Sequence, residues 1–109
     1  NLKRVIFINS ISGLNSQVNQ SIYSSSKHAL QAYSEVLSKE SIDFDFDVMS
    51  FNPGGINTPL WDKFENNVNK SEFLSINTIT STIEFLSTLP SNTYVKNFTL
   101  LPKPDVTTN

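Results

Sequence analysis

The stretch that predicts the fold is residues 5–10, which read VIFINS. Four consecutive apolar residues, three of them β-branched, are followed at once by the turn-formers Asn9 and Ser10. A continuous rather than alternating apolar run indicates a strand that is covered on both faces, as in a parallel sheet. The stretch therefore predicts an α/β fold.

A long helix and a second strand are expected next. Residues 22–39 contain no Gly or Pro, their apolar residues recur at helical spacing, and Ser21 is a suitable N-cap. Residues 46–51 predict the second strand, which the NPGG turn at residues 52–55 stops. Strand, helix and strand make a βαβ unit, whose crossover is almost always right-handed.

The remaining elements are expected to extend this sheet. We predict an amphipathic helix over residues 60–70, a second long helix over residues 71–89 and a last strand over residues 95–101. The sequence thus predicts three strands and two to three helices, with no repeats and no long linker.

Composition excludes several classes of protein. The chain has 109 residues, 38% of them hydrophobic, and a net charge of −2. One small core and no basic stripe are typical of a single domain that does not bind nucleic acid. The absence of Cys excludes disulfides, Cys-based zinc sites and thiol catalysis. No apolar run approaches the roughly 20 residues that cross a bilayer, so we expect no membrane partner.

Two polar loops follow the first two predicted strands. Ligands of open parallel sheets bind outside the carboxyl ends of the strands. The first loop offers the hydroxyl groups of Ser10 and Ser12, and the second has Pro-Gly-Gly at residues 53–55, followed by Ile56 and Thr58. Because two residues of this second loop lack a Cβ, we expect a ligand to approach its backbone closely.

Tyr23 and Lys27 lie one helical turn apart at the start of the predicted helix, so both side chains can share a face. A phenol has a pKa of about 10, and a neighbouring ammonium lowers it, which makes the pair a candidate general acid and base. The alternative is a packed Tyr beside a solvated Lys. The chemical interpretation is favoured because Ser10, 13 positions earlier, and Pro53, 30 positions later, fall at the same sheet edge.

Taken together, these motifs resemble those of the short-chain dehydrogenases/reductases. Residues 8–13 look like that family's serine strand, residues 23–30 like its Tyr-x-x-x-Lys helix and residues 51–58 like its Pro-Gly loop. The match is close over residues 5–61. The resemblance implies the C-terminal part of a Rossmann-like, doubly wound parallel sheet.

The resemblance also implies a role for each candidate residue. Tyr23 would be the general acid in carbonyl reduction or the base in alcohol oxidation, and Lys27 would lower its pKa and bind the nicotinamide ribose. Ser10 would hold the substrate oxygen, with Ser12 as its rival, and Trp61 is either a wall of the substrate pocket or a core residue. The residues implied to bind the cofactor are Tyr23, Lys27, Asn52, Pro53, Gly54, Gly55, Ile56 and Thr58.

The implied cofactor is NAD or NADP, of which we favour NADP, and the implied substrate is a small carbonyl compound or alcohol. No metal is expected. The full-length protein is expected to be a cytoplasmic dimer or tetramer of identical subunits. Tyr33, Val36 and Leu37 would form part of a subunit interface or, alternatively, an ordinary core face.

One departure from the family lies upstream. The Gly-rich turn for the pyrophosphate has no counterpart, since the three glycines at 13, 54 and 55 do not form that motif, and residue 1 is Asn. We therefore expect residues 1–109 to be the C-terminal portion of one NAD(P)-binding domain, without its N-terminal half, and to be inactive alone. The alternative is a non-catalytic or truncated relative that acts in binding or assembly.

Two other interpretations were rejected. Residues 43–47 read DFDFD, but a calcium loop starting at Asp43 would need Gly and Glu where Val48 and Gly54 stand. We expect the phenylalanines of this run to point inward instead. His28 has no carboxylate at a spacing that suits a hydrolase triad, so we expect it to be a surface neighbour of Lys27.

Overall fold

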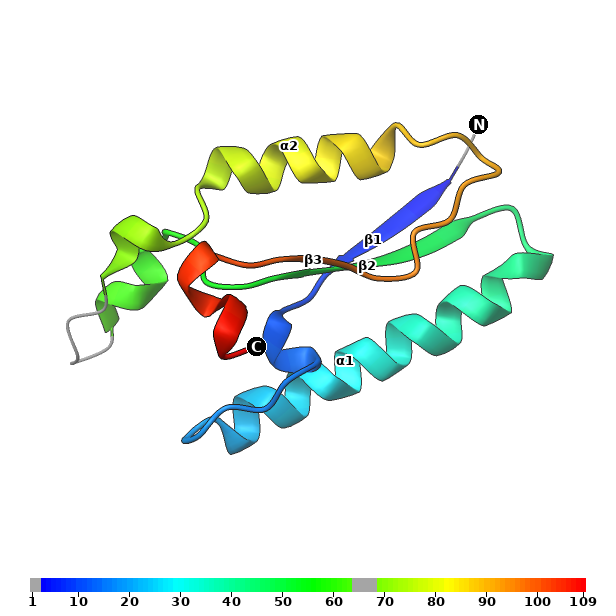
Figure 1. Cartoon of the computed structure of the whole chain (residues 1–109). Coiled ribbons are helices and arrows are strands. Elements are labelled where there is room, and N and C mark those ends of the chain that lie inside the picture. Colours follow the sequence, from blue (N-terminus) through cyan, green and yellow to red (C-terminus); the bar gives the residue numbers. More distant parts are fainter. Residues whose placement is uncertain (1–2, 64–68) are drawn as a thin grey trace.

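The chain folds into three layers, with a parallel sheet between two helices, in a computed structural model that describes residues 3–63 and 69–109 (Figure 1). The strands β1 (Arg4–Ile8), β2 (Asp47–Pro53) and β3 (Phe98–Leu100) lie in the order β1-β2-β3. Helix α1 (Ser21–Glu40) covers one face and helix α2 (Ile76–Ser87) covers the other. The predicted α/β class and parallel sheet are confirmed.

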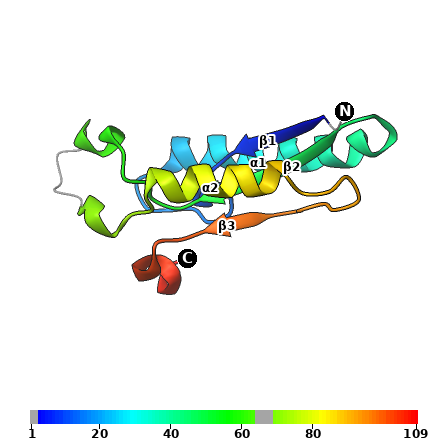
Figure 2. The same ribbon diagram turned by 90° about the horizontal axis from the view of Figure 1, so that it is seen from above.

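Strand β2 lies in the middle of the sheet, with β1 and β3 as the two edge strands (Figure 2). Arg4 pairs with Asp47 at the start of β1, and Phe51 of β2 pairs with Phe98 of β3. Short 3-10 helices occupy several connections, namely η1 (Ile11–Gly13), η2 (Ser41–Asp43), η3 (Pro59–Lys63), η4 (Lys70–Glu72) and η5 (Lys103–Thr107).

Several predicted boundaries were wrong for local reasons. The second strand does not stop at residue 52, because Asn52 and Pro53 pair with β3. Ser21 is the first residue of α1 rather than its cap, and Gln20 takes the N-cap position without a side-chain hydrogen bond. Helix α2 begins only after Ser75, whose hydroxyl oxygen accepts the N–H of Thr78 and caps the helix.

The last strand is shorter than predicted, since β2 offers partners only to residues 98–100. The predicted helix at residues 60–70 is replaced at its two ends by η3 and η4, and its residues 64–68 lie outside the described part of the chain. Phe44 does not point inward, because it precedes the strand and its side chain is 68% exposed.

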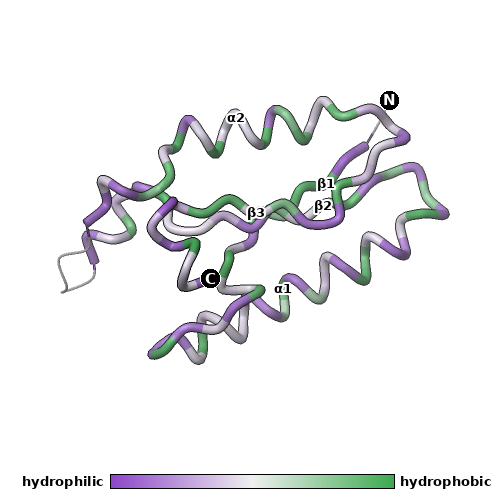
Figure 3. Tube along the Cα trace, viewed as in Figure 1, coloured by the Kyte–Doolittle hydropathy of each residue, from purple (hydrophilic) through white to green (hydrophobic). Residues whose placement is uncertain are grey.

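The two faces of the sheet are packed by different chemistry. Beneath α2, Phe51, Ile79 and Leu86 form an apolar core. Beneath α1, the buried helix residues are Ser24, Ser34 and Ser38. Figure 3 shows the corresponding alternation of hydrophilic and hydrophobic residues along α1.

Serines suit this second face because they are small and bond to their own helix. The hydroxyl groups of Ser34 and Ser38 donate to the carbonyl groups of Gln31 and Glu35, at 2.9 and 2.7 Å. The apolar residues of α1 lie farther from the centre of this face, and Tyr33 and Val36 are 59% and 53% exposed. The Tyr33 ring still packs edge-on against Phe7 of β1, with ring centres 5.9 Å apart, and Leu37 is half-buried. The interpretation of Tyr33, Val36 and Leu37 as an ordinary core face was therefore wrong for Val36, whereas Tyr33 and Leu37 lie at the margin of the packing between α1 and the sheet.

One buried arginine ties the apolar layer to the sheet. The Arg4 guanidinium lies 2.9 Å from the Asp47 carboxylate and donates to the carbonyl groups of Leu86 and Leu89, each at 2.9 Å. It thereby joins β1, β2 and the end of α2. No helix in the described part of the chain is long and apolar enough to span a membrane.

Candidate active site

The candidate residues gather where the chain leaves β1 and β2, at the left of Figure 1. The N–H of Asn9 donates to the carbonyl of Phe51 at 2.8 Å, so the chain is still paired with β2 immediately before Ser10. Helix α1 begins nearby and packs against η1. The strand ends and the helix start thus form one corner of the molecule.

Ser10 begins this corner as the N-cap of η1. Its side-chain oxygen accepts the N–H of Ser12 at 3.1 Å, and none of the described groups accepts the hydrogen of its hydroxyl. Ser12 differs, because its hydroxyl is buried and donates to the Gln20 side chain at 3.4 Å. Ser10 is therefore better placed than Ser12 to donate a hydrogen bond to a ligand.

Tyr23 and Lys27 lie on the first turns of α1, as their spacing predicts. The Lys27 ammonium lies 5.6 Å from the centre of the Tyr23 ring, and the ring is 46% exposed. An ammonium at this distance is attracted to the face of the aromatic ring. The structure thus brings together an accessible phenol and a cation.

Gly13 shows how closely the serine loop, residues 9–13, approaches α1. A Cβ at this position would lie 2.8 Å from both the side-chain nitrogen of Asn9 and the backbone oxygen of Lys27. Only glycine allows this approach without a shift. The loop that carries Ser10 is therefore packed directly against the helix turn that carries Lys27.

The Pro-Gly loop is also shaped by contacts within the chain. A Cβ on Gly54 would lie 2.8 Å from Pro102, and one on Gly55 would lie 3.1 Å from the Phe73 ring. Close packing of these neighbours therefore explains both glycines. None of the three glycines has a positive φ angle.

Ile56 presents a backbone donor. Its neighbours form a short parallel bridge with Leu74, in which Leu74 donates to Gly55 and accepts from Asn57, each at 2.9 Å. The carbonyl of Ile56 accepts the indole N–H of Trp61 at 2.8 Å. Within the described residues the N–H of Ile56 has no acceptor.

The other predicted residues of this loop lie at various depths. Asn52 is fully buried beneath α1, where its side-chain oxygen faces the Ser50 hydroxyl at 3.5 Å. Thr58 is half-buried. Trp61 lies in η3, with its ring centre 4.9 Å from that of Phe73. Trp61 is therefore part of the packing that holds η3 against the loop.

The residues present fit one end of a nicotinamide dinucleotide. The N–H of Ile56 is a donor for a carboxamide, and the Lys27 ammonium is a donor for ribose hydroxyl groups. A pyrophosphate needs a Gly-rich turn whose backbone it can approach. No such turn occurs in the sequence, and each of its three glycines is packed against neighbours in the chain.

Two residues at this corner were missed by sequence reasoning. Asn9 and Gln31 are joined by a hydrogen bond of 3.2 Å beneath α1. The available signals were an amide at the end of an apolar strand and a glutamine one turn after Lys27 on the same helix. Neither signal distinguishes a buried contact from an exposed side chain.

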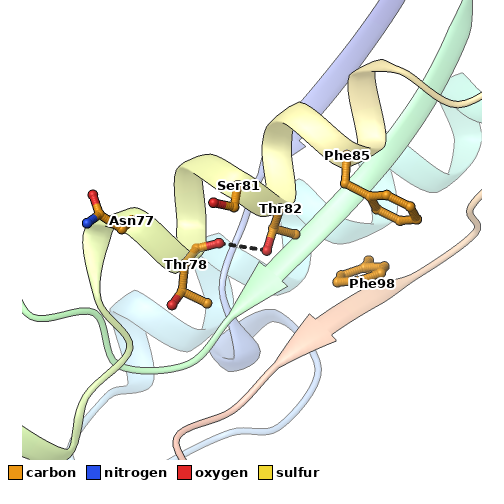
Figure 4. A pocket seen from close by; sticks show the side chains of 6 residues that line it. All are labelled: Asn77, Thr78, Ser81, Thr82, Phe85 and Phe98. Atoms are coloured by element: carbon orange, nitrogen blue, oxygen red, sulfur yellow. Dashed lines mark hydrogen bonds between the residues drawn. The ribbon is translucent and has the colours of Figure 1, made fainter.

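Other candidate chemistry lies away from this corner. His28 is exposed, and one of its ring nitrogens lies 2.8 Å from the carbonyl of Ser24. In the described ranges, no three His, Asp or Glu side chains gather as metal ligands. A cavity of about 430 Å³ opens between α2 and β3, where Phe85 faces Phe98 (Figure 4), and none of the predicted site residues lines it.

The chain is similar to known short chain dehydrogenases and to an oxidoreductase. The family model described as short chain dehydrogenase matches residues 3–69. The uncharacterized oxidoreductase YusZ of Bacillus subtilis is 36% identical over 73 residues, which are 67% of this chain and 24% of that protein. The chain thus spans about a quarter of this curated relative.

Solved structures show the same fold. A betaketoacyl-ACP reductase (FabG) from Bacteroides thetaiotaomicron matches with a TM-score of 0.75 and 23% identity, over 95% of this chain and 42% of that one. A protein assigned as a short chain dehydrogenase from Shigella flexneri, solved with NADP, matches with a TM-score of 0.79 and 21% identity, over 91% and 41%. The chain covers about two fifths of each of these structures.

Proposed function

Because this chain belongs to the short chain dehydrogenase family, we propose that it is part of an NAD(P)-dependent oxidoreductase that interconverts a small carbonyl compound and its alcohol. The observation that supports this activity is the corner formed by Ser10, Tyr23 and Lys27. It combines a hydroxyl hydrogen without an acceptor in the described chain, an exposed phenol and an ammonium 5.6 Å from the phenol ring.

In the proposed reduction these residues act on the substrate oxygen. The Ser10 hydroxyl donates a hydrogen bond to the carbonyl oxygen, where negative charge develops. Tyr23 then gives its proton to that oxygen, and Lys27 stabilises the phenolate that remains. In the oxidation direction Tyr23 takes the proton back from the alcohol.

The chain's part in cofactor binding is the nicotinamide end. A bound NAD(P)H supplies the hydride that the protein itself cannot provide. Lys27 would bind the ribose and the N–H of Ile56 the carboxamide, while Tyr23 and the 52–58 loop would line the ring. NADP is the first cofactor to test, because the Shigella flexneri relative was solved with it.

The remaining proposals concern the whole protein. We place residues 1–109 as the C-terminal portion of one dinucleotide-binding domain, whose pyrophosphate-binding turn lies in another segment. The 109-residue chain alone is then expected to show no turnover. The exposed side of α1 that includes Tyr33 and Val36 is the proposed contact face between identical subunits.

A substitution at Tyr23 tests the activity in a longer protein that contains this chain. Tyr23→Phe should lower turnover of a carbonyl panel with NADPH by about 10²- to 10⁴-fold, because a general acid is removed. NADPH binding, measured by fluorescence titration, should change less than threefold. Tyr94→Phe is the matched control, since Tyr94 is equally exposed at 46% but lies before β3.

The outcomes separate the alternatives. Equal loss of turnover and NADPH binding in Tyr23→Phe would contradict the role as acid. A wild-type protein that binds NADPH but turns over none of the panel would favour a non-catalytic relative that acts in binding or assembly.

A further inference from the structure

We propose that Asn9 and Gln31 form a buried amide clamp that positions Lys27 relative to Ser10. Asn9 and Gln31 are then positioning residues for the reaction. The inference rests on the proposed function. Asn9 immediately follows β1 and precedes Ser10, and its side chain is turned toward α1.

Both amide hydrogens of Asn9 are used on the helix. Its side-chain nitrogen donates to the backbone oxygen of Lys27 at 3.3 Å and to the side-chain oxygen of Gln31 at 3.2 Å. These acceptors are one helical turn apart. Asn9 is only 6% exposed, so water does not compete effectively for these bonds. The Asn9 side chain thus fixes the position of α1 relative to the end of β1.

Gln31 is in turn held by three segments of chain. Its side-chain oxygen accepts from Asn9, directly after β1, at 3.2 Å and from the Ser50 hydroxyl of β2 at 2.9 Å. Its side-chain nitrogen donates to the Asn97 side-chain oxygen at 3.1 Å, just before β3. All of these bonds are directional. The clamp therefore ties α1 to β1, β2 and the approach to β3.

Gly13 gives independent evidence that this corner is built to close tolerance. A Cβ at Gly13 would come within 2.8 Å of the two atoms that the clamp joins, the Asn9 side-chain nitrogen and the Lys27 backbone oxygen. The serine loop is thus packed against the clamp itself. Any slide of α1 would disturb the loop and the Lys27 turn together.

A functional role follows from which residues the clamp connects. Ser10 follows Asn9 directly in the chain, and Lys27 contributes the carbonyl group that Asn9 binds. Burying an amide is costly, and the buried side-chain oxygen of Asn9 has no hydrogen-bond partner in the described part of the chain. Apolar residues would fill the same space at lower cost, but they would not fix the position of α1 along the strand. A misplacement of about 1 Å at a reacting centre can lower the rate by about 10²-fold. The clamp prevents such a displacement of Lys27 relative to Ser10.

The test uses the longer protein that contains this chain, with Gln31→Met and Asn9→Leu as the disrupting variants. Both keep roughly the volume of the side chain and remove the amide. Ser38→Ala is the control, because Ser38 is buried on the same side of α1 but bonds only to its own helix. Asn97→Leu, at an exposed position, removes one bond from Gln31 and is the milder variant.

Two readouts are needed. The first is kcat and KM with NADPH, where we expect kcat to fall about 10- to 100-fold in Gln31→Met while KM changes less than threefold. The second does not depend on activity. It is the acetylation rate of the Lys27 amine relative to that of the Lys39 amine, measured by mass spectrometry of the native protein; the Lys39 side chain is 71% exposed. We expect this ratio to change at least threefold.

Each outcome decides the inference. A change in the Lys27 labelling ratio together with a loss of kcat supports the clamp. An unchanged ratio and unchanged kcat overturn it, as do equal changes in Ser38→Ala. If the unsubstituted longer protein shows no turnover but the labelling ratio still differs between it and Gln31→Met, the clamp is supported and the proposed function is overturned. If Asn9→Leu does not fold, Gln31→Met and Asn97→Leu carry the same comparison.

Discussion

Replacing Arg4 by Met should be among the most destabilising changes in this chain. The substitution keeps the aliphatic stem and removes a guanidinium whose side chain is only 5% exposed. Three contacts of 2.9 Å are lost, one to the Asp47 carboxylate and two to the carbonyl groups of Leu86 and Leu89. These contacts join two strands to the end of α2.

The magnitude follows from the burial of the pair. Breaking a buried ion pair by removing one partner costs about 3–5 kcal/mol. The Asp47 side chain is 27% exposed and regains some hydration, so we expect about 3 kcal/mol, near the lower end of that range. With a urea dependence of about 1.5 kcal/mol per molar, the unfolding midpoint should fall by about 2 M.

The assay is urea unfolding followed by circular dichroism. Lys39→Met is the matched control, since Lys39 pairs with Glu35 on the helix surface and its side chain is 71% exposed. That change should cost less than about 0.5 kcal/mol. Asp47→Asn should cost less than Arg4→Met, because Arg4 keeps its bonds to the carbonyl groups of Leu86 and Leu89.

Two results would contradict this role of Arg4. If Arg4→Met costs no more than Lys39→Met, the buried arginine does not hold the layers together. If Asp47→Asn costs as much as Arg4→Met, the charge pair alone carries the effect and the bonds to α2 contribute nothing.

Three further predictions concern packing and capping. Gly13→Ala should lower both the urea unfolding midpoint and the turnover of the longer protein, because its Cβ would lie 2.8 Å from the backbone oxygen of Lys27. Gly55→Ala should be milder, because its Cβ would meet only the Phe73 ring, at 3.1 Å, and equal effects of the two changes would contradict the backbone clash. Ile79→Ala should lower the free energy of unfolding in urea by about 2–5 kcal/mol and Ile76→Ala by under about 1 kcal/mol, since Ile79 is 8% and Ile76 54% exposed. Similar losses for the two changes would contradict the assignment of Ile79 to the core. Ser75→Ala should cost about 0.5–2 kcal/mol through the lost cap of α2, and Ser81→Ala on the exposed side of that helix should cost less; a neutral Ser75→Ala would show that the cap is dispensable.

Much of the fold could be predicted because its signals are local. The apolar run at residues 5–8, the glycine-free helix and the second strand each contain their own pattern, and the order strand-helix-strand permits few topologies. The pairing of Tyr23 with Lys27 was predictable for the same reason, since four residues make about one turn of a helix.

The sequence by itself determined the α/β class, the parallel sheet and the approach of Tyr23 to Lys27. Tertiary structure decided which side of α1 is buried, because serines that bond to their own helix fit closely against the sheet, whereas Val36 points to solvent and Tyr33 reaches only Phe7 with its ring edge-on. It also decided the contacts of Asn9 and Gln31, which are far apart in sequence. Periodicity assumes that apolar residues are buried, and it has no means of detecting polar groups that find their partners only when distant segments meet.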